Sequence, residues 1–142
     1  MPDDRAAACF IDTNVWLYAF VESGEPAKSP AARALIAGTQ PVVSTQVINE
    51  VCVNLLKQAS FTEEQVSQLI ESFYAKCGVV ELDRPVLLTA SQLRRRYSLS
   101  FWDGLIVAAA LSAGVELLYS EDLQHNLSID GQLRVSNPFA EG

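Results

Sequence analysis

The sequence has few of the residues that build soft metal sites and redox sites. Its only histidine is His125, and its three cysteines, Cys9, Cys52 and Cys77, have no CxxC spacing. A histidine or cysteine metal cluster is therefore excluded, and the odd cysteine count predicts buried, reduced thiols. No G-x-S-x-G motif accompanies the histidine, so we expect His125 to lie on the surface and not in a Ser–His catalytic arrangement.

Long apolar runs, linkers and repeats are also missing. No run approaches the roughly 18 apolar residues of a membrane helix, and the first residues lack the basic flank and apolar stretch of a signal peptide. With 142 residues, 49% of them hydrophobic, we expect a single domain over 1–142, located in the cytoplasm without membrane contact.

Positive charge is scarce. Lys and Arg number 10 against 17 Asp and Glu, a net charge of −7, and such a chain repels polyphosphates unless bound cations neutralise it locally. Three of the basic residues, Arg94, Arg95 and Arg96, are consecutive and precede Tyr97. They fit two interpretations: an RNA contact through phosphates and stacking, or a solvated helix end whose cations favour the helix dipole.

Strand and helix patterns alternate along the chain. We expect strands over 8–11, 41–43, 79–80, 116–119 and 133–135, and helices over 27–37, 44–59, 62–76, 84–97 and 102–113. The expected helix N-caps are Ser44, Thr62 with Gln65, Asp83, and Ser100 with Asp103; the expected left-handed helix ends are Gly78 and Gly114. Strands bridged by helices predict a three-layer α/β/α sandwich around a central, mostly parallel sheet.

Four acidic residues stand out at positions where the chain would otherwise be apolar or without an evident role for a charge. Asp12 follows the first strand, Glu50 lies within a helix, Asp103 opens an almost uncharged helix, and Asp122 follows a later strand. Carboxylates without His or Cys suit a hard cation such as Mg²⁺ or Mn²⁺. Each acid also has a purely structural reading, as a cap, a surface residue or a loop residue, and either Glu121 or Asp122 is the inward-pointing acid of its loop.

The order and spacing of these motifs resemble the PIN domain, and within it the VapC-type toxins, over 9–139. The segments that carry the resemblance are Asp12-Thr13-Asn14, the helical 47–51 with Glu50, Phe101-Trp102-Asp103-Gly104 with the apolar run after it, and 118–123. The resemblance implies that Asp12, Glu50, Asp103 and Asp122 are the acidic metal ligands, supported by Asn14 and Ser120. It also implies that the strand before Asp122 lies beside the first strand.

By resemblance, the function is that of a Mg²⁺- or Mn²⁺-dependent endoribonuclease, the toxin of a type II toxin–antitoxin module, acting on RNA and forming a homodimer. The bound antitoxin would insert a basic side chain among the acids. Apolar residues that one domain of this size would not cover suggest the same partners: Leu35, Ile36, Phe61, Leu69, Ile70, Phe73 and Tyr74. Two alternatives remain: a non-catalytic binding module of the same fold, and a haloacid-dehalogenase-like phosphohydrolase, which needs an Asp where this chain has Asn14.

Overall fold

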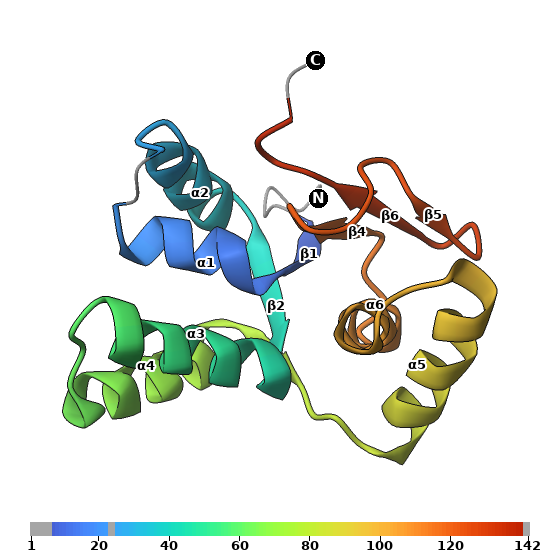
Figure 1. The fold of residues 1–142 in the computed structure, drawn as a ribbon, viewed down its shortest axis with the longest axis horizontal. Coiled ribbons are helices and arrows are strands. Elements are labelled where there is room, and N and C mark those ends of the chain that lie inside the picture. The colour runs from blue at the N-terminus through green and yellow to red at the C-terminus, as the bar shows by residue number, and fades with distance from the viewer. Residues whose placement is uncertain (1–6, 23–24, 141–142) are drawn as a thin grey trace, which may run out of the picture.

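The computed structural model describes residues 7–22 and 25–140 and contains six strands and six helices within them. The strands are β1 (Ala8–Ile11), β2 (Gln40–Ser44), β3 (Gly78–Val80), β4 (Leu117–Tyr119), β5 (Ser128–Ile129) and β6 (Leu133–Ser136). The helices are α1 (Thr13–Phe20), α2 (Lys28–Ala37), α3 (Thr45–Gln58), α4 (Glu63–Lys76), α5 (Arg84–Tyr97) and α6 (Phe101–Ser112) (Figure 1).

The strands form one sheet in the order β3-β2-β1-β4-β6-β5. All neighbouring pairs are parallel except β5 with β6, an antiparallel pair at the edge. The chain builds outward from β1 to β2 and β3, and then crosses back to place β4 on the other side of β1. The boundary between β1 and β4 is therefore the topological switch point, where open α/β sheets bind ligands beyond the carboxyl ends of the strands.

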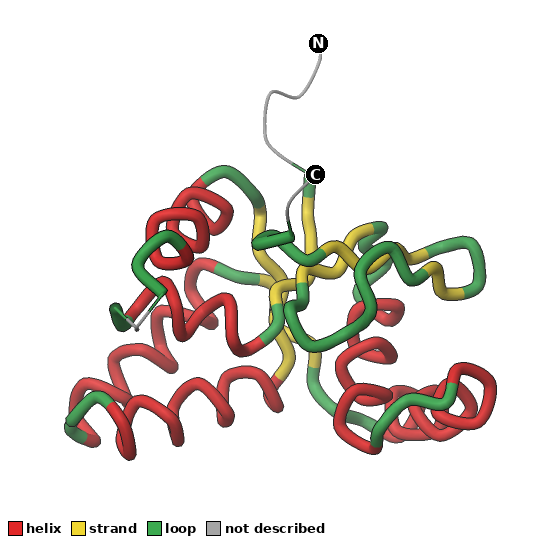
Figure 2. Tube along the Cα trace, turned by 45° about the horizontal axis from the view of Figure 1, so that its top comes forward, coloured by secondary structure: helices red, strands yellow, loops and turns green. Residues whose placement is uncertain are grey.

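Helices cover both faces of this sheet. In Figures 1 and 2, α1, α2, α3 and α4 lie on one side of the strands, and α5 and α6 lie on the other. This division follows from right-handed crossovers, because the connections that move outward from β1 and the one that returns past it emerge on opposite faces. The mostly parallel three-layer α/β/α architecture expected from the sequence is confirmed.

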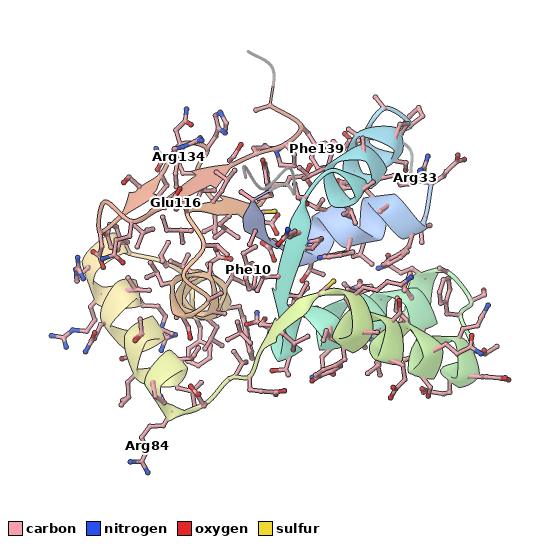
Figure 3. All side chains as sticks on the ribbon, turned by 180° about the vertical axis from the view of Figure 1, so that it is seen from behind. Phe10, Arg33, Arg84, Glu116, Arg134 and Phe139 are labelled. Carbon is pink, nitrogen blue, oxygen red and sulfur yellow. The ribbon has the colours of Figure 1, made fainter. Side chains whose placement is uncertain are left out.

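The core is centred on β1, β4 and α6. Phe10, Ile11 and Leu118 are completely buried, and Phe10 lies between the helical layers in Figure 3. Helix α6 is buried along most of its length, from Gly104 to Ala110, which explains its nearly uncharged sequence. A charged residue at the start of such a helix is held at the margin of the core and not at the free surface.

Most of the predicted helix starts are confirmed. The side chains of Ser44, Thr62, Asp83 and Ser100 each accept a backbone N–H in the first turn, and Thr62 with Gln65 forms the complete capping box. Gly114 has the expected positive φ of 73°. The prediction for Gly78 was wrong: α4 ends at Cys77 in extended backbone, and Gly78 is already the first residue of β3. Strand β5 was not predicted, because two residues carry too little pattern.

The thiols and the histidine are mostly where we expected them. All three cysteines are free, Cys9 and Cys52 are buried, and Cys77 is half-buried. His125 is exposed, and its Nδ1 accepts the backbone N–H of Asn137 at 2.9 Å. No helix in the described part of the chain is long and apolar enough to cross a membrane.

Candidate acidic site at the sheet switch point

Asp12 lies at the carboxyl end of β1, at the switch point. Its backbone N–H donates to the carbonyl of Tyr119 at the end of β4, at 3.0 Å, so the two strand ends are joined there. Its side chain is only 6% exposed. One carboxylate oxygen caps α1 by accepting the N–H of Thr13 at 2.7 Å, and the other accepts the hydroxyl of Ser120 at 2.9 Å.

The environment of Asp12 disfavours its charge. Burial raises its pKa to about 6, the Thr13 amide and the Ser120 hydroxyl partly oppose this, and the charges of Asp122 and Glu50 raise it further. The Asp12 carboxylate is therefore repelled by both Asp122 and Glu50. A buried carboxylate with two acidic neighbours and no cationic side chain among the causes of its pKa shift is a group that gains from a bound cation.

Ser120 shapes the loop that carries the fourth acid. Its hydroxyl oxygen accepts the backbone N–H groups of Asp122 and Leu123, at 3.2 and 3.3 Å, while it donates to Asp12. Asp122 is then held from α1, because the amide of Asn14 donates to both of its carboxylate oxygens at 3.1 and 3.2 Å. Asn14 and Ser120 thus link the ends of β1 and β4 through side chains as well as backbone.

Glu121 points into a different set of contacts. Its carboxylate accepts the Lys28 ammonium at 2.5 Å and the Tyr18 hydroxyl at 2.8 Å. Lys28 also contacts Glu25 and lies over the rings of Tyr18 and Phe139. Glu121 is thus held by α1 and α2, whereas the neighbouring Asp122 is held by Asn14, two residues after Asp12.

The pKa of Asp122 is also raised. Asp122 is an exposed residue, so only partial desolvation of its carboxylate contributes; this is the largest cause, followed by the charges of Asp103 and Glu121, and the Asn14 amide opposes them. Asp103 lies half-buried in the first turn of α6, where its backbone N–H is capped by Ser100 at 3.1 Å. From α6, its charge is one of the causes that raise the pKa of Asp122.

Glu50 approaches from α3. It is half-buried, and its carboxylate accepts the side-chain amide of Gln46, one turn earlier, at 2.7 Å. Through their charges, Glu50 neighbours Asp12, Asp12 neighbours Asp122, and Asp122 neighbours Asp103. Yet within residues 7–22 and 25–140 no three His, Cys, Asp or Glu side chains are grouped so that they could hold one metal ion.

The three consecutive arginines of α5 point to different partners. Arg94 donates to the carbonyl of Phe101 at 3.1 Å and lies over the Phe101 ring at 4.2 Å. Arg96 pairs with Asp130, whose carboxylate also accepts the Tyr97 hydroxyl. Other arginines lie at the margin of the molecule, as Arg33, Arg84 and Arg134 do in Figure 3. Only Arg95 of the cluster has no side-chain partner recorded among the described residues.

Three residues of this neighbourhood had no role in the sequence analysis. Lys28 and Tyr18 hold Glu121 from α2 and α1, and no local pattern connects them to a loop about a hundred positions away. Gln46 was detectable in principle, because residues four apart on a helix share a face and Gln46 precedes Glu50 by that interval.

The fold is thus that of an α/β protein with a mostly parallel sheet and acidic side chains around its switch point. The chain belongs to the PIN domain family, whose model matches residues 9–127. No protein of curated function matches it by sequence.

Solved structures share the fold. One is a toxin–antitoxin complex from Klebsiella pneumoniae, with a TM-score of 0.70 and 20% identity, covering 92% of this chain and 98% of that chain. Another is the Mycobacterium tuberculosis sarcin-ricin loop cleaving toxin VapC20, with a TM-score of 0.65 and 19% identity over 80% and 89% of the two chains. A third is DNA-bound VapBC from Salmonella typhimurium, with a TM-score of 0.66 and 16% identity over 93% and 98%.

Proposed function

We propose that this protein is a divalent-metal-dependent endoribonuclease and that Asp12 is the centre of its site. The observation that carries the proposal is the buried Asp12 carboxylate at the β1–β4 switch point, with its pKa raised by burial and by Asp122 and Glu50, in a chain of the PIN domain family. The family match also disfavours the haloacid-dehalogenase-like alternative, which lacks its second Asp here.

The residues present fit a hard cation. Their donors are carboxylate oxygens, which Mg²⁺ and Mn²⁺ prefer, and the carboxylates repel one another without a positive charge. Asp12, Glu50, Asp103 and Asp122 are the proposed ligands, and their side chains must converge when an ion binds. A bound ion would neutralise charge on the scissile phosphate and lower the pKa of an attacking water.

The other side chains of the site have positioning roles in this proposal. Ser120 fixes one oxygen of Asp12 and the backbone of the Asp122 loop, and Asn14 fixes the Asp122 carboxylate. Each of them donates to an oxygen of the ligand it orients, so each leaves that carboxylate ionised and limits its rotation. The Gln46 amide likewise donates to Glu50 and limits the rotation of its side chain.

The test is RNA cleavage by purified protein with Mg²⁺ or Mn²⁺. Asp12→Asn and Asp103→Asn should each abolish cleavage while circular dichroism shows an intact fold, and wild-type products should carry 5′-phosphate and 3′-hydroxyl ends. Glu116→Gln is a matched control, because Glu116 is an exposed acid beside the amino end of β4. Wild-type rates in both Asn variants would reject the assignment, and wild-type protein that never cleaves RNA would favour the non-catalytic alternative.

The proposed biological role is that of the toxin in a type II toxin–antitoxin module, acting as a homodimer and inhibited by an antitoxin. The solved structures of toxin–antitoxin complexes with this fold support the role. An arginine from the antitoxin would suit the site, because its guanidinium can pair bidentately with Asp12 or Glu50 in place of a metal ion. Expression should arrest growth, Asp12→Asn should not, and co-expression of the reading frame beside the gene should relieve the arrest.

A further inference from the structure

A pocket of about 480 Å³ opens directly beside the acidic site. It lies between the start of α3, the segment before α5 and the start of α6. Its lining is Thr45, Gln46, Asn49, Glu50, Leu82 and Trp102. The volume is within the roughly 300–1,000 Å³ of small-ligand sites, and Glu50 belongs to both the pocket and the acidic site. Whatever enters the pocket therefore lies next to the proposed reaction centre.

One wall of the pocket is an exposed aromatic side chain held in place. Trp102 is 62% exposed, the highest value among the large apolar residues of the described chain. Its ring packs edge-on against Phe101, with centroids 5.2 Å apart, and the Arg94 guanidinium covers the Phe101 ring. The indole thus contacts a ring that is itself held by Arg94. Exposing so large an apolar side chain marks a surface that binds something.

The polar part of the lining comes from α3 and includes Gln46, whose side chain has a buried acceptor without a partner. Gln46 is 7% exposed and donates its amide N–H to Glu50, which leaves its Oε1 buried with no hydrogen bond. Native proteins rarely leave such an atom unpaired unless a ligand or water supplies the donor. Asn49 also lines the pocket, one helical turn after Thr45. Its side-chain amide is exposed and offers two N–H donors and one carbonyl acceptor.

We propose that this pocket binds one base of the RNA strand next to the scissile phosphate. The base stacks on Trp102, and its edge is read by the amides of Asn49 and Gln46. Aromatic rings bind any base through its face, whereas Asn and Gln amides distinguish base edges. A base is uncharged, so it can enter beside Glu50, where a phosphate would be repelled. This inference rests on the proposed function, because it names the part of the RNA that enters the site.

Tryptophan fluorescence tests the stack directly, because the chain has two tryptophans and Trp16 is buried. Octaribonucleotides of each base are titrated into the Asp12→Asn protein, which is not expected to cleave them. Stacking should quench the fluorescence, and the quench should vanish in the added variant Trp102→Phe, which leaves only the buried Trp16 to report. An octamer with abasic sites should not quench.

Affinity and its salt dependence separate a base contact from general damage. With labelled octamers, Trp102→Ala should weaken binding on the order of 10- to 100-fold, the range for loss of one base–aromatic stack, and Trp102→Phe should weaken it less. The slope of log affinity against log salt should not change, because no phosphate contact is lost. Asn49→Ala should alter the order of base preference but keep the quench. Val53→Ala, at an exposed apolar residue of α3 outside the pocket, is the control and should bind like its parent.

The remaining outcomes each decide the question. Wild-type protein that cleaves RNA at a rate and affinity unchanged by Trp102→Ala would overturn the pocket and leave the proposed function standing. Quenching and base preference without any metal-dependent cleavage would support the pocket and reject the nuclease. If Trp102→Ala loses self-association in light scattering but keeps its RNA affinity, this surface binds a protein partner and the base-binding proposal is wrong. No RNA binding by any form would overturn the pocket and the nuclease together.

Discussion

The Asp12 carboxylate lies where its negative charge is disfavoured in the folded protein. Its carboxylate caps α1 and accepts the Ser120 hydroxyl, two contacts that favour the ionised form. Burial outweighs both and raises the pKa to about 6. In the absence of metal the charge at Asp12 is therefore a net cost to the folded state, as expected for a group selected for ligand binding.

The pH dependence of stability should expose this cost in metal-free protein. Because the folded pKa is above the unfolded value, the folded state binds more protons between about pH 4 and 6, so stability falls as pH rises through that window. The contribution is about 3 kcal/mol at most. Urea unfolding in EDTA at a series of pH values should show the decrease in wild type, and Asp12→Asn should flatten it. Parallel curves for the two proteins would refute this origin.

Residue types were readable from the sequence, but side-chain directions were not. Asp12 and Asp103 stood out because each adjoins an apolar segment, whereas Glu50 lies on the polar side of its helix and was selected by the family resemblance. Glu121 and Asp122 are adjacent and chemically alike, and only the position of Lys28 on a distant helix separates their roles. Such a choice depends on tertiary contacts, which local pattern does not contain.

At the scale of elements, α2 is tied to the acidic site through one ion pair. Lys28 and the Tyr18 hydroxyl hold Glu121, and this fixes the loop so that Asp122 meets Asn14. Lys28→Met and Glu121→Gln should each lower kcat for metal-dependent cleavage, roughly 2- to 10-fold, with little change in KM. The double variant should be no slower than the slower single variant, because one contact is removed in all three. Additive losses in this cycle would show that the two residues act independently.

The arginines of α5 give a second test at this scale. If all three held RNA phosphates, the triple Ala variant would lose about 2.1 in salt slope on single-stranded RNA, from roughly 0.7 per contact. Because Arg94 and Arg96 already have partners in Phe101 and Asp130, we expect a loss of only about 0.7, reproduced by Arg95→Ala alone. Fluorescence anisotropy at several salt concentrations measures the slope. An unchanged slope would make all three ordinary helix surface.

Helix starts were predicted better than helix ends or short strands. A cap such as Ser44 or Thr62 is a local hydrogen bond between residues three apart, so its signal is present in the sequence. Gly78 was misread because a glycine after a helix fits both a left-handed end and a strand start. Here a side chain would meet Val42 on the neighbouring β2, at 3.3 Å, so the close approach of the strand accounts for the glycine. Strand β5 exists through its pairing with β6 alone.

At the scale of the whole molecule, strand order creates the site. The sequence predicted that Asp12 and Asp122 follow strands, and only the family resemblance suggested that those strands are neighbours. In the structure β4 lies against β1 because the last crossover returns past it, and this joins groups more than a hundred residues apart. The pairing of strands so far apart in the sequence depends on how the apolar faces of all six helices pack together.

Self-association is also a property of the whole molecule. The structure exposes apolar residues on a helix that the sequence had not suggested as an interface. Of the apolar residues that suggested a dimer, Phe73 is buried and only Tyr74 ranks among the exposed large ones, whereas Leu87 and Leu88 on α5 are 47% and 58% exposed. We expect a homodimer that buries Leu87 and Leu88, because leaving both in water is unfavourable. Light scattering at micromolar concentration should give a dimer for wild type and a folded monomer for Leu87→Lys with Leu88→Lys. Tyr74→Lys on α4 is the matched control and should stay dimeric. If instead the α4 variant is monomeric and the α5 variant is dimeric, the interface lies on α4. A monomeric wild type would refute the homodimer.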